Sequence, residues 1–501
     1  MSDKDENLNN LNPYLQGPYA PIDAEINAHQ LKVIGEIPTD FGGAYFRNGP
    51  NPAKQPSGLH HWFDGDGMLH AIHFEDGKAS YRNRYIQSND YLADNSGTLE
   101  KAGIFSPAQS DGSSTVYKNT ANTDVVMHNG ELMALWYISG KPVRLNAQTL
   151  STLREDDFGG KLPNNVSAHS KVDLQTGEFL FFDYGLYDPW YSFGVVDRNN
   201  NLTHFTQIEL PGPRLPHDMA ITENYAILMD LPIVFTEQGL RNKVWSIHAD
   251  RALPTRFGVL PRNGDGKQIK WFEFPGCYIY HVINAWEEGD NIVLYCCKMV
   301  ENGRQLPIEY GPYAPMVNVL ALRAVVTKWT MNLTTGVGKE EQIDDAISEF
   351  PVVNLGLTGR QTRYSYHGAI PDTETQVFDG ILKYDLTDGS YKRHRFDPNV
   401  CGSEPAFAPR FNAKSEDDGY VVSFVTDIST RESRVLIIDA QNIEGRPLAE
   451  ICLPQCVPLG FHGTWANLDE FQTSPSKIYS YAIILFNQKG SLWSATDFCS
   501  G

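Results

Sequence analysis

Asn-Gly and Asp-Gly pairs punctuate the sequence at short intervals, and this feature constrains the fold more than any other. These pairs supply the positive φ angles that tight β-hairpins require. Between them lie strand-length runs of apolar or alternating residues, such as 131–136, 179–182, 291–295 and 420–425. The pairs include Asp76-Gly77, Asn129-Gly130, Asn302-Gly303, Asp388-Gly389 and Asp418-Gly419. The pattern predicts an all-β protein built from many short strands joined by tight turns.

Helical periodicity is scarce along the chain. Residues 21–29 and 340–347 could each form one or two helical turns, but no segment shows three turns of an amphipathic stripe. Many short strands without an obvious linker favour a series of sandwiches or a propeller, and no WD or kelch repeat decides between the two. Residues 1–15, which are rich in Asn, are expected to form a disordered tail.

Composition excludes one class of function. The 501 residues include 41 Lys and Arg against 61 Asp and Glu, a formal net charge of −20. Nucleic acid is therefore an unsuitable partner, because phosphate binding needs a concentrated basic surface. The polar N-terminus lacks an apolar signal segment, and no apolar run approaches the roughly 20 residues of a membrane span. With seven irregularly spaced cysteines and no disulfide framework, we expect a cytoplasmic protein, soluble or peripherally associated with a membrane.

Four of the 14 histidines share a sequence context, at the end of a short apolar or proline-containing run. They are His169, His217, His281 and His462. Their wide separation excludes a local metal motif such as His-Glu-x-x-His on one helix. It is compatible with ligands that different sheets deliver to one point. The alternative is a set of core histidines that backbone groups satisfy, which is the commoner use of a buried histidine.

Eight short segments, in the same order over about residues 12–466, resemble motifs of the carotenoid cleavage oxygenase family. They are 43–52 (GAYFRNGPNP), 61–68 (HWFDGDGM), 120–123 (TANT), 168–171 (AHSK), 217–218 (HD), 281–287 (HVINAWE), 404–407 (EPAF) and 462–465 (HGTW). The resemblance implies one domain over residues 16–501, folded as a seven-bladed β-propeller with a loop and helix cap over a substrate tunnel. It also implies a non-haem Fe(II) on the propeller axis, held by His169, His217, His281 and His462.

The resemblance implies a dioxygenase. Members of the family insert both atoms of O2 across an activated C=C bond and release two carbonyl products, without a keto-acid cosubstrate. Four neutral imidazoles leave the iron its full charge and, in an octahedral shell, two free coordination positions.

Carboxylates normally orient ligand histidines by accepting their second N–H. The family uses three glutamates for this purpose, and Glu349 and Glu404 match two of them. Tyr137 stands at the third position, where its oxygen could accept a hydrogen bond but adds no charge. The affinity for the metal or the iron potential is therefore expected to differ from that of other members.

Two aromatic residues bear on the substrate. Phe105 and Trp136 match the Tyr and Lys with which stilbene-cleaving and phenylpropene-cleaving members hold a phenolic hydroxyl. Neither side chain can exchange that proton, so the sequence favours a carotenoid or apocarotenoid, an apolar alkene held between apolar tunnel walls. Both aromatics could instead be packed simply between blades. Two other functions stay open: a stilbene or phenylpropene dioxygenase and, because of Tyr137, a non-catalytic iron-binding propeller.

The segment Tyr310–Val326 is the most apolar loop-like region of the chain. It is interpreted as core, with contact to a membrane near the tunnel mouth as the alternative. An acidic surface gains nothing from anionic lipids, so such contact would have to be apolar. The predicted partners are thus O2 and an apolar alkene, without a protein partner or nucleic acid. The chain after Trp465 is longer than expected, and residues 478–486 are assigned only a closing strand.

Overall fold

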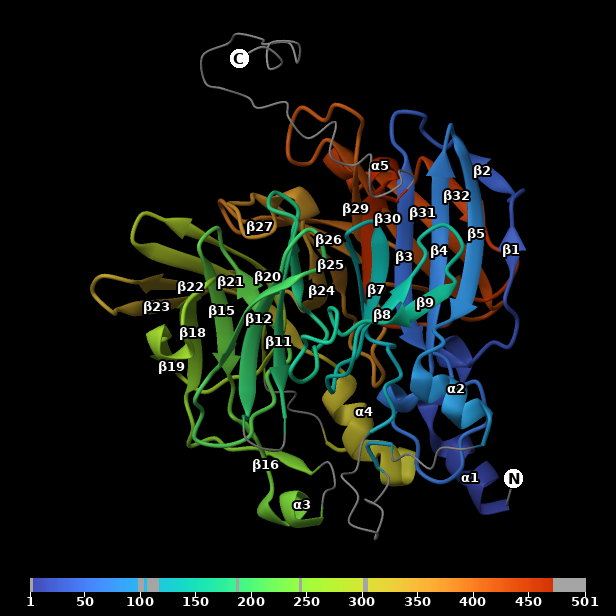
Figure 1. Cartoon of the computed structure of the whole chain (residues 1–501). Coiled ribbons are helices and arrows are strands. Elements are labelled where there is room, and N and C mark those ends of the chain that lie inside the picture. The colour runs from blue at the N-terminus through green and yellow to red at the C-terminus, as the bar shows by residue number, and fades with distance from the viewer. Residues whose placement is uncertain are drawn as a thin grey trace.

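Seven antiparallel sheets surround one axis and make up the body of the protein (Figure 1). The computed structural model describes residues 3–97, 103–105, 117–185, 189–242, 246–300 and 305–471. One strand of each sheet lies nearest the axis, since these strands contact one another between neighbouring sheets, as β33 does β6 and β29, and β20 does β14 and β24. This arrangement confirms the predicted seven-bladed propeller.

Five blades have four strands each, ordered from the axis outward. They are β6 (Asp124–His128), β7 (Glu131–Leu135), β8 (Val143–Leu145) and β9 (Thr152–Glu155); β10 (Lys171–Asp173), β11 (Glu178–Tyr184), β12 (Tyr191–Val196) and β13 (Leu202–Gln207); β14 (Ala220–Ile221), β15 (Tyr225–Asp230), β18 (Thr255–Pro261) and β19 (Lys270–Phe274); β20 (Ile279–Glu288), β21 (Asn291–Met299), β22 (Ala324–Asn332) and β23 (Gly338–Gln342); and β24 (Ser348–Val352), β25 (Tyr364–Ala369), β26 (Gly380–Asp385) and β27 (Ser390–Arg395).

The remaining two blades combine strands from both ends of the chain and close the ring. One contains β33 (Gly463–Asn467), β3 (Gly43–Pro50), β4 (Gly67–Glu75), β5 (Lys78–Tyr85) and β1 (Asn27–Ala28). The other contains β29 (Ala406–Pro409), β28 (Val400–Gly402), β30 (Gly419–Asp427), β31 (Glu432–Asp439), β32 (Ala449–Cys452) and β2 (Val33–Gly35). Because β3 pairs with β33 and β2 with β32, the ends of the ring are joined by backbone hydrogen bonds.

Local turn chemistry and interlocking aromatic rings explain why these residues form blades. Asn129 and Gly130, which join β6 to β7, have φ of 55° and 76°, as a tight hairpin requires. The Asn-Gly prediction is therefore confirmed at this turn. Between two blades the fully buried Trp329 packs against Phe257 and Phe274, with ring centroids 5.2 and 6.5 Å away.

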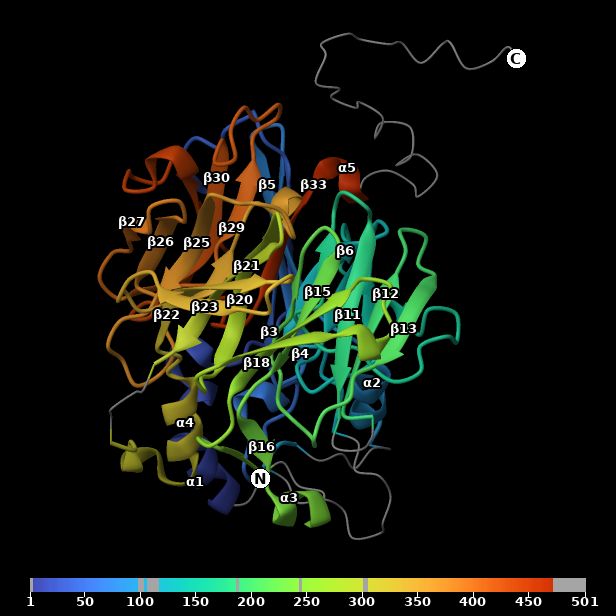
Figure 2. The same ribbon diagram turned by 90° about the vertical axis from the view of Figure 1, so that its left-hand side faces the viewer.

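The helices lie at the two ends of the propeller (Figures 1 and 2). At one end, the capped end, are α1 (Asp3–Leu11), α2 (Asn89–Asn95), α3 (Glu237–Asn242), α4 (Ala314–Leu320) and a hairpin of β16 (Ile233–Phe235) and β17 (Ile247–Ala249). The short α5 (Leu468–Phe471) lies at the other end. None of the helices in the described ranges has the length and hydropathy of a membrane span.

Three sequence expectations differ from the structure. The expected disordered tail is wrong for its described part, because α1 is helical and the buried Tyr14 stacks on Trp62 at 4.6 Å. The expected helical turns at 21–29 and 340–347 are absent as well, since β1 and β23 lie there and pair with neighbouring strands. In all three places, pairing or packing with residues distant in the sequence decides the structure. The closing strand expected at 478–486 lies outside the described residues.

Candidate metal centre

The four predicted histidines meet on the propeller axis, each from the inner strand of a different blade. His281 lies within β20, His462 directly precedes β33, and His169 and His217 lie shortly before β10 and β14. Their ring centroids are 4.4 to 5.0 Å apart in every pair for which a contact is found. All four side chains are buried. The structure thus brings together residues that the sequence separates widely.

Three of these histidines form a group that could hold a metal ion. One ring nitrogen from each of His169, His281 and His462 lies within 4.8 Å of the others. The Nε2 atoms of His169 and His281 are buried and have no hydrogen-bond partner among the described residues. A buried imidazole nitrogen without a partner is costly unless something else satisfies it. The donor set therefore fits a transition metal bound by imidazole.

The protonation state of the rings also suits a metal. Burial, followed by the other histidines, lowers the pKa of His169 and of His281 well below the usual value. Burial and His462 do the same to the pKa of His217. The rings of His169, His217 and His281 are therefore neutral near pH 7, and a neutral ring offers the lone pair that a metal requires.

Two of the predicted glutamates orient histidines of this group. Nδ1 of His281 lies 2.5 Å from Oε2 of Glu349, and Nδ1 of His462 lies 2.9 Å from Oε1 of Glu404. Burial raises the pKa of both carboxyl groups. Each hydrogen bond turns the Nε2 edge of its histidine away from the carboxylate. This is the usual outer arrangement of a histidine metal site.

Tyr137 does not take the role that a third glutamate would have. Its ring packs against that of His217 at a centroid distance of 4.8 Å, but Nδ1 of His217 is buried and has no hydrogen-bond partner among the described residues. Burial and Tyr280 raise the pKa of Tyr137, while hydrogen bonds with Tyr278 and Tyr184 lower it less. The phenol is thus engaged with other tyrosines, and the hydrogen bond to His217 that the sequence left open is not formed.

Sequence reasoning assigned no role to two aspartates that hold the ligand-bearing backbone, although one of them, Asp218, lies in the motif 217–218. Oδ2 of Asp124 accepts the backbone N–H of His169 at 3.0 Å. Oδ2 of Asp218 accepts the backbone N–H of Val282 at 2.7 Å, and its Oδ1 pairs with Lys171 at 2.7 Å. His169 has a φ of 63°, a left-handed conformation that costs a non-glycine residue energy and that the contact with Asp124 helps to maintain. Their position directly after the segments 120–123 and His217 was the available signal.

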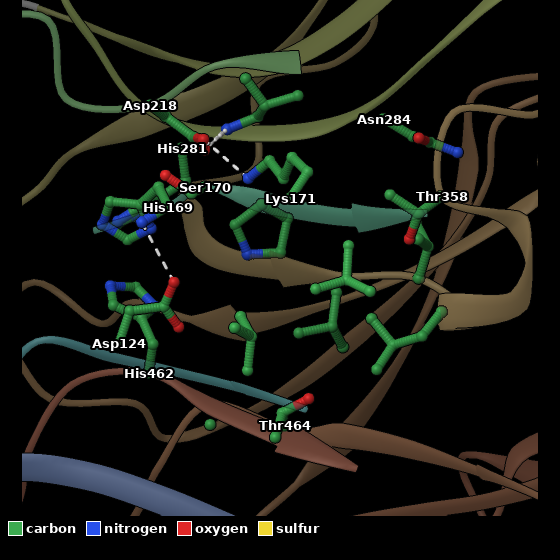
Figure 3. A pocket seen from close by; sticks show the side chains of 18 of the residues that line it. Asp124, His169, Ser170, Lys171, Asp218, His281, Asn284, Thr358, His462 and Thr464 are labelled. Carbon is green, nitrogen blue, oxygen red and sulfur yellow. Dashed lines mark hydrogen bonds and ion pairs between the residues drawn. The ribbon is translucent and has the colours of Figure 1, made fainter. Parts of the chain in front are cut away.

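A narrow cavity of about 160 Å³ reaches the centre along the axis (Figure 3). His169, His281 and His462 lie on one side of it, and Asn284 and Thr358 on the other. Valine, isoleucine and leucine side chains line much of the wall between them. The space is suited to molecules much smaller than a polyene.

A larger cavity of about 490 Å³ lies at the capped end. Its walls are mostly apolar and come from β16, β17, α4 and three tyrosines, Tyr137, Tyr278 and Tyr280, of which Tyr137 and Tyr280 pack on the ring of His217. The two predicted tunnel residues are not among its described lining. Phe105 lies behind it, against the ring of His61, which does line it, and Trp136 is buried with Tyr117 and Ile138. Trp136 is thus buried, whereas Phe105 is half-buried and packs on His61 and Tyr313 at the capped end and not between two blades.

Comparison with known proteins identifies the class of molecule. The family described as "Retinal pigment epithelial membrane protein" matches residues 19–467. A carotenoid 9,10(9',10')-cleavage dioxygenase of Pisum sativum is 34% identical over 92% of this chain and 91% of its own. An isoeugenol monooxygenase of Pseudomonas nitroreducens is 31% identical over 91% of this chain and 98% of its own. A lignostilbene dioxygenase crystal structure from Pseudomonas brassicacearum superposes with a TM-score of 0.81 at 27% identity, covering 91% and 98% of the two chains. The chain therefore belongs to this family of oxygenases, the carotenoid cleavage oxygenases.

Proposed function

We propose that the protein is a non-haem iron(II) dioxygenase that cleaves a C=C bond of a carotenoid or apocarotenoid with O2 and releases two carbonyl products. The observation that carries the proposal is a buried cluster of histidines, two of them oriented by carboxylates, next to a large apolar cavity. The 34% identity to a carotenoid cleavage dioxygenase supports the same reaction class.

Iron is the metal that this proposal assigns to His169, His217, His281 and His462. Imidazole ligands suit Fe(II), and bound iron would supply the activation of O2 that the reaction needs. The chain's own contribution is to orient two of the rings through Glu349 and Glu404 and to exclude bulk water by burial. The same burial lowers the pKa of His169 and His281 and so keeps these two rings unprotonated.

The substrate assignment rests on the large cavity. An extended polyene needs long apolar walls, and the described lining includes Leu215, Ile233, Met299, Leu320 and Leu322. Neither Phe105 nor Trp136 has a side-chain group that could take up the proton of a phenol, and both lie outside the described lining, so a phenolate clamp at those positions is disfavoured. These points support a carotenoid or apocarotenoid.

Cleavage of an aromatic alkene is the second candidate. Tyr280 lines the cavity next to His217, at a ring distance of 4.8 Å, and brings a phenolic hydroxyl to a mostly apolar wall. A hydroxyl there could hydrogen-bond a polar group of a stilbene or phenylpropene. The similarities to an isoeugenol monooxygenase and to a lignostilbene dioxygenase support this alternative.

Peripheral contact with a membrane or another lipid surface would deliver such substrates. Large apolar side chains are exposed in the cavity lining, Val319 at 54% and Ile247 at 37%, and in the segment that precedes α4, Ile308 at 80% and Leu306 at 46%. The segment 310–326 is divided, because Tyr313, Met316, Val317 and Leu320 are buried while Val319 is exposed. Sedimentation with neutral lipid vesicles tests the contact: Ile308→Asp should reduce co-sedimentation, and Ile428→Asp, at an exposed site on a blade, should not. Equal binding by both variants would contradict it.

The reaction itself is tested with iron-loaded protein, an apocarotenoid and a 4-hydroxystilbene, and chromatography of the aldehydes formed. We expect products from the apocarotenoid. Ile233→Trp, which fills the large cavity, should lower the turnover of that substrate without changing the iron content, whereas Ile34→Trp, on the exposed strand β2, should leave turnover unchanged. Products from the stilbene alone would favour the second candidate. Bound iron with no product from either substrate would indicate a non-catalytic propeller.

A further inference from the structure

The four histidines of the centre have unequal surroundings. His281 and His462 each have a buried carboxylate on Nδ1, at 2.5 and 2.9 Å. His169 has no such partner on its ring among the described residues, but Asp124 holds its backbone N–H, and its ring belongs to the group of three whose ligand atoms lie within 4.8 Å. His217 lies outside that group.

Among the contacts that the structure describes, ring packing alone fixes the orientation of the His217 side chain. The rings of Tyr137 and Tyr280 both lie 4.8 Å from it. Its Nδ1 is buried without a hydrogen-bond partner among those residues. Dispersion contacts restrict a ring to a volume, but they do not select one tautomer or one rotation about χ2 as a carboxylate acceptor does.

We infer that His217 is the weakest of the four metal ligands, because Tyr137 packs on it without accepting its Nδ1–H, and that Tyr137→Glu would tighten metal binding. The inference rests on the proposed function only as far as the centre binds a metal. Among the four histidines, the described ring contacts of Tyr137 reach His217, so a change at residue 137 would affect the metal through that ring.

Two physical effects predict that Tyr137→Glu increases the affinity for the metal. A carboxylate at residue 137 would hold Nδ1–H and direct Nε2 toward the centre, and it would add negative charge near a divalent cation. Removal of the carboxylate partner of a ligand histidine typically lowers metal affinity by about 10-fold to 100-fold. The hydroxyl of Tyr137 is engaged with Tyr278 and Tyr184, so its removal should affect the metal little.

The test is equilibrium binding of Co(II) to the metal-free full-length protein, by competition with a chelator and by the visible absorption of bound Co(II). Four variants are compared with the wild type: His217→Ala, His281→Ala, Tyr137→Glu and Tyr137→Phe. Far-UV circular dichroism checks that each variant is folded. Because the ligand is Co(II) alone, no step depends on substrate or turnover.

We expect His281→Ala to weaken Co(II) binding at least about 10-fold more than His217→Ala does, in line with the value of an outer carboxylate. Tyr137→Glu should strengthen binding about 10-fold and change the absorption of bound Co(II), whereas Tyr137→Phe should match the wild type. Equal losses in the two histidine variants would overturn the inference, whether or not Tyr137→Glu folds. So would weaker binding in Tyr137→Phe, because the phenol would then be the orienting group. A wild type that binds no Co(II) would overturn the metal centre and the proposed function together.

Discussion

Glu349 offers a sharp test of the metal centre. Its buried negative charge is expected to destabilise the metal-free protein and to stabilise the metal-bound protein, while its hydrogen bonds stabilise both. The side chain is fully buried, and its Oε2 lies 2.5 Å from Nδ1 of His281 and accepts the backbone N–H of Phe350 at 2.7 Å. Its Oε1 has no hydrogen-bond partner among the described residues, and burial raises the pKa of the carboxyl group well above the usual value. The carboxylate is therefore costly without a cation nearby and favourable with one.

Two substitutions separate charge from hydrogen bonding. In Glu349→Gln the amide oxygen can still accept both N–H groups, so only the charge is lost. We expect metal affinity to fall about 10-fold in Glu349→Gln and about 100-fold in Glu349→Leu. For the latter, the stabilisation by a given excess of metal falls by about 2.7 kcal/mol. The metal-free Gln variant should be at least as stable as the metal-free wild type, while the Leu variant should lose about 1 to 3 kcal/mol for the unpaired N–H groups.

The assay is chemical unfolding of each variant with and without Co(II), which gives both stabilities and, from their difference, the gain on metal binding. Glu404→Asp, at the other oriented histidine, serves as a variant that keeps the charge but moves it. The reasoning would be refuted if Glu349→Leu gained as much stability from Co(II) as the wild type. It would also be refuted if metal-free Glu349→Gln were markedly destabilised.

Three further predictions concern the propeller. Arg144→Met should cost about 3 to 5 kcal/mol in urea unfolding, because the buried Asp156 loses the Arg144 Nε at 2.9 Å and keeps the more distant Arg154, at 3.8 Å, as its remaining ion-pair partner among the described residues. A loss below about 1 kcal/mol would contradict this. Burial raises the pKa of Asp173, but the hydrogen bond and charge of Arg262 lower it more, so the pKa in the folded protein lies below 3.8. The stability that this carboxylate contributes is therefore complete above pH 3.8 and is lost as the pH falls through the pKa of the folded protein. Asp173→Asn should therefore destabilise at pH 7, with a deficit that narrows toward pH 2, and a constant deficit would refute the assignment. Trp329→Ala should lower the free energy of unfolding by about 3 to 5 kcal/mol, because it leaves a cavity between the blades. The same unfolding assay measures this loss, and near-native stability would show that the neighbouring blades collapse into the cavity.

Local signals predicted the parts of the fold that local forces decide. Asn129-Gly130 forms its hairpin because the required φ angles belong to those two residues. The strand β23 was missed because it is an exposed outer strand whose residues do not alternate, and only its pairing with β22 defines it. Helix α1 was missed because residues distant in the sequence hold it, as in the hydrogen bond that Nδ2 of Asn9 donates to the carbonyl of Pro56 at 2.9 Å.

In the candidate site, too, local motifs predicted some residues, while contacts between distant residues determine the others. The four histidines and two glutamates could be named from their motifs, and the structure brings them together. Asp124 and Asp218 act through hydrogen bonds to backbone groups 45 and 64 residues away, which no local pattern reveals. The role of Tyr137 could not be predicted either, since only the geometry distinguishes a tyrosine that accepts the His217 Nδ1–H from one that packs on its ring.

The central claim is that this histidine centre uses O2 to cleave a polyene. The most direct measurement is mass spectrometry of the products when iron-loaded protein acts on an apocarotenoid under 18O2, with O2 uptake recorded in parallel and His281→Ala as the metal-site control. We expect two carbonyl products, each carrying one labelled oxygen, and we expect neither bound iron nor O2 uptake in a folded His281→Ala variant. Iron-loaded wild type that consumes no O2 with any polyene, or a His281→Ala variant that keeps its iron and its activity, would contradict it.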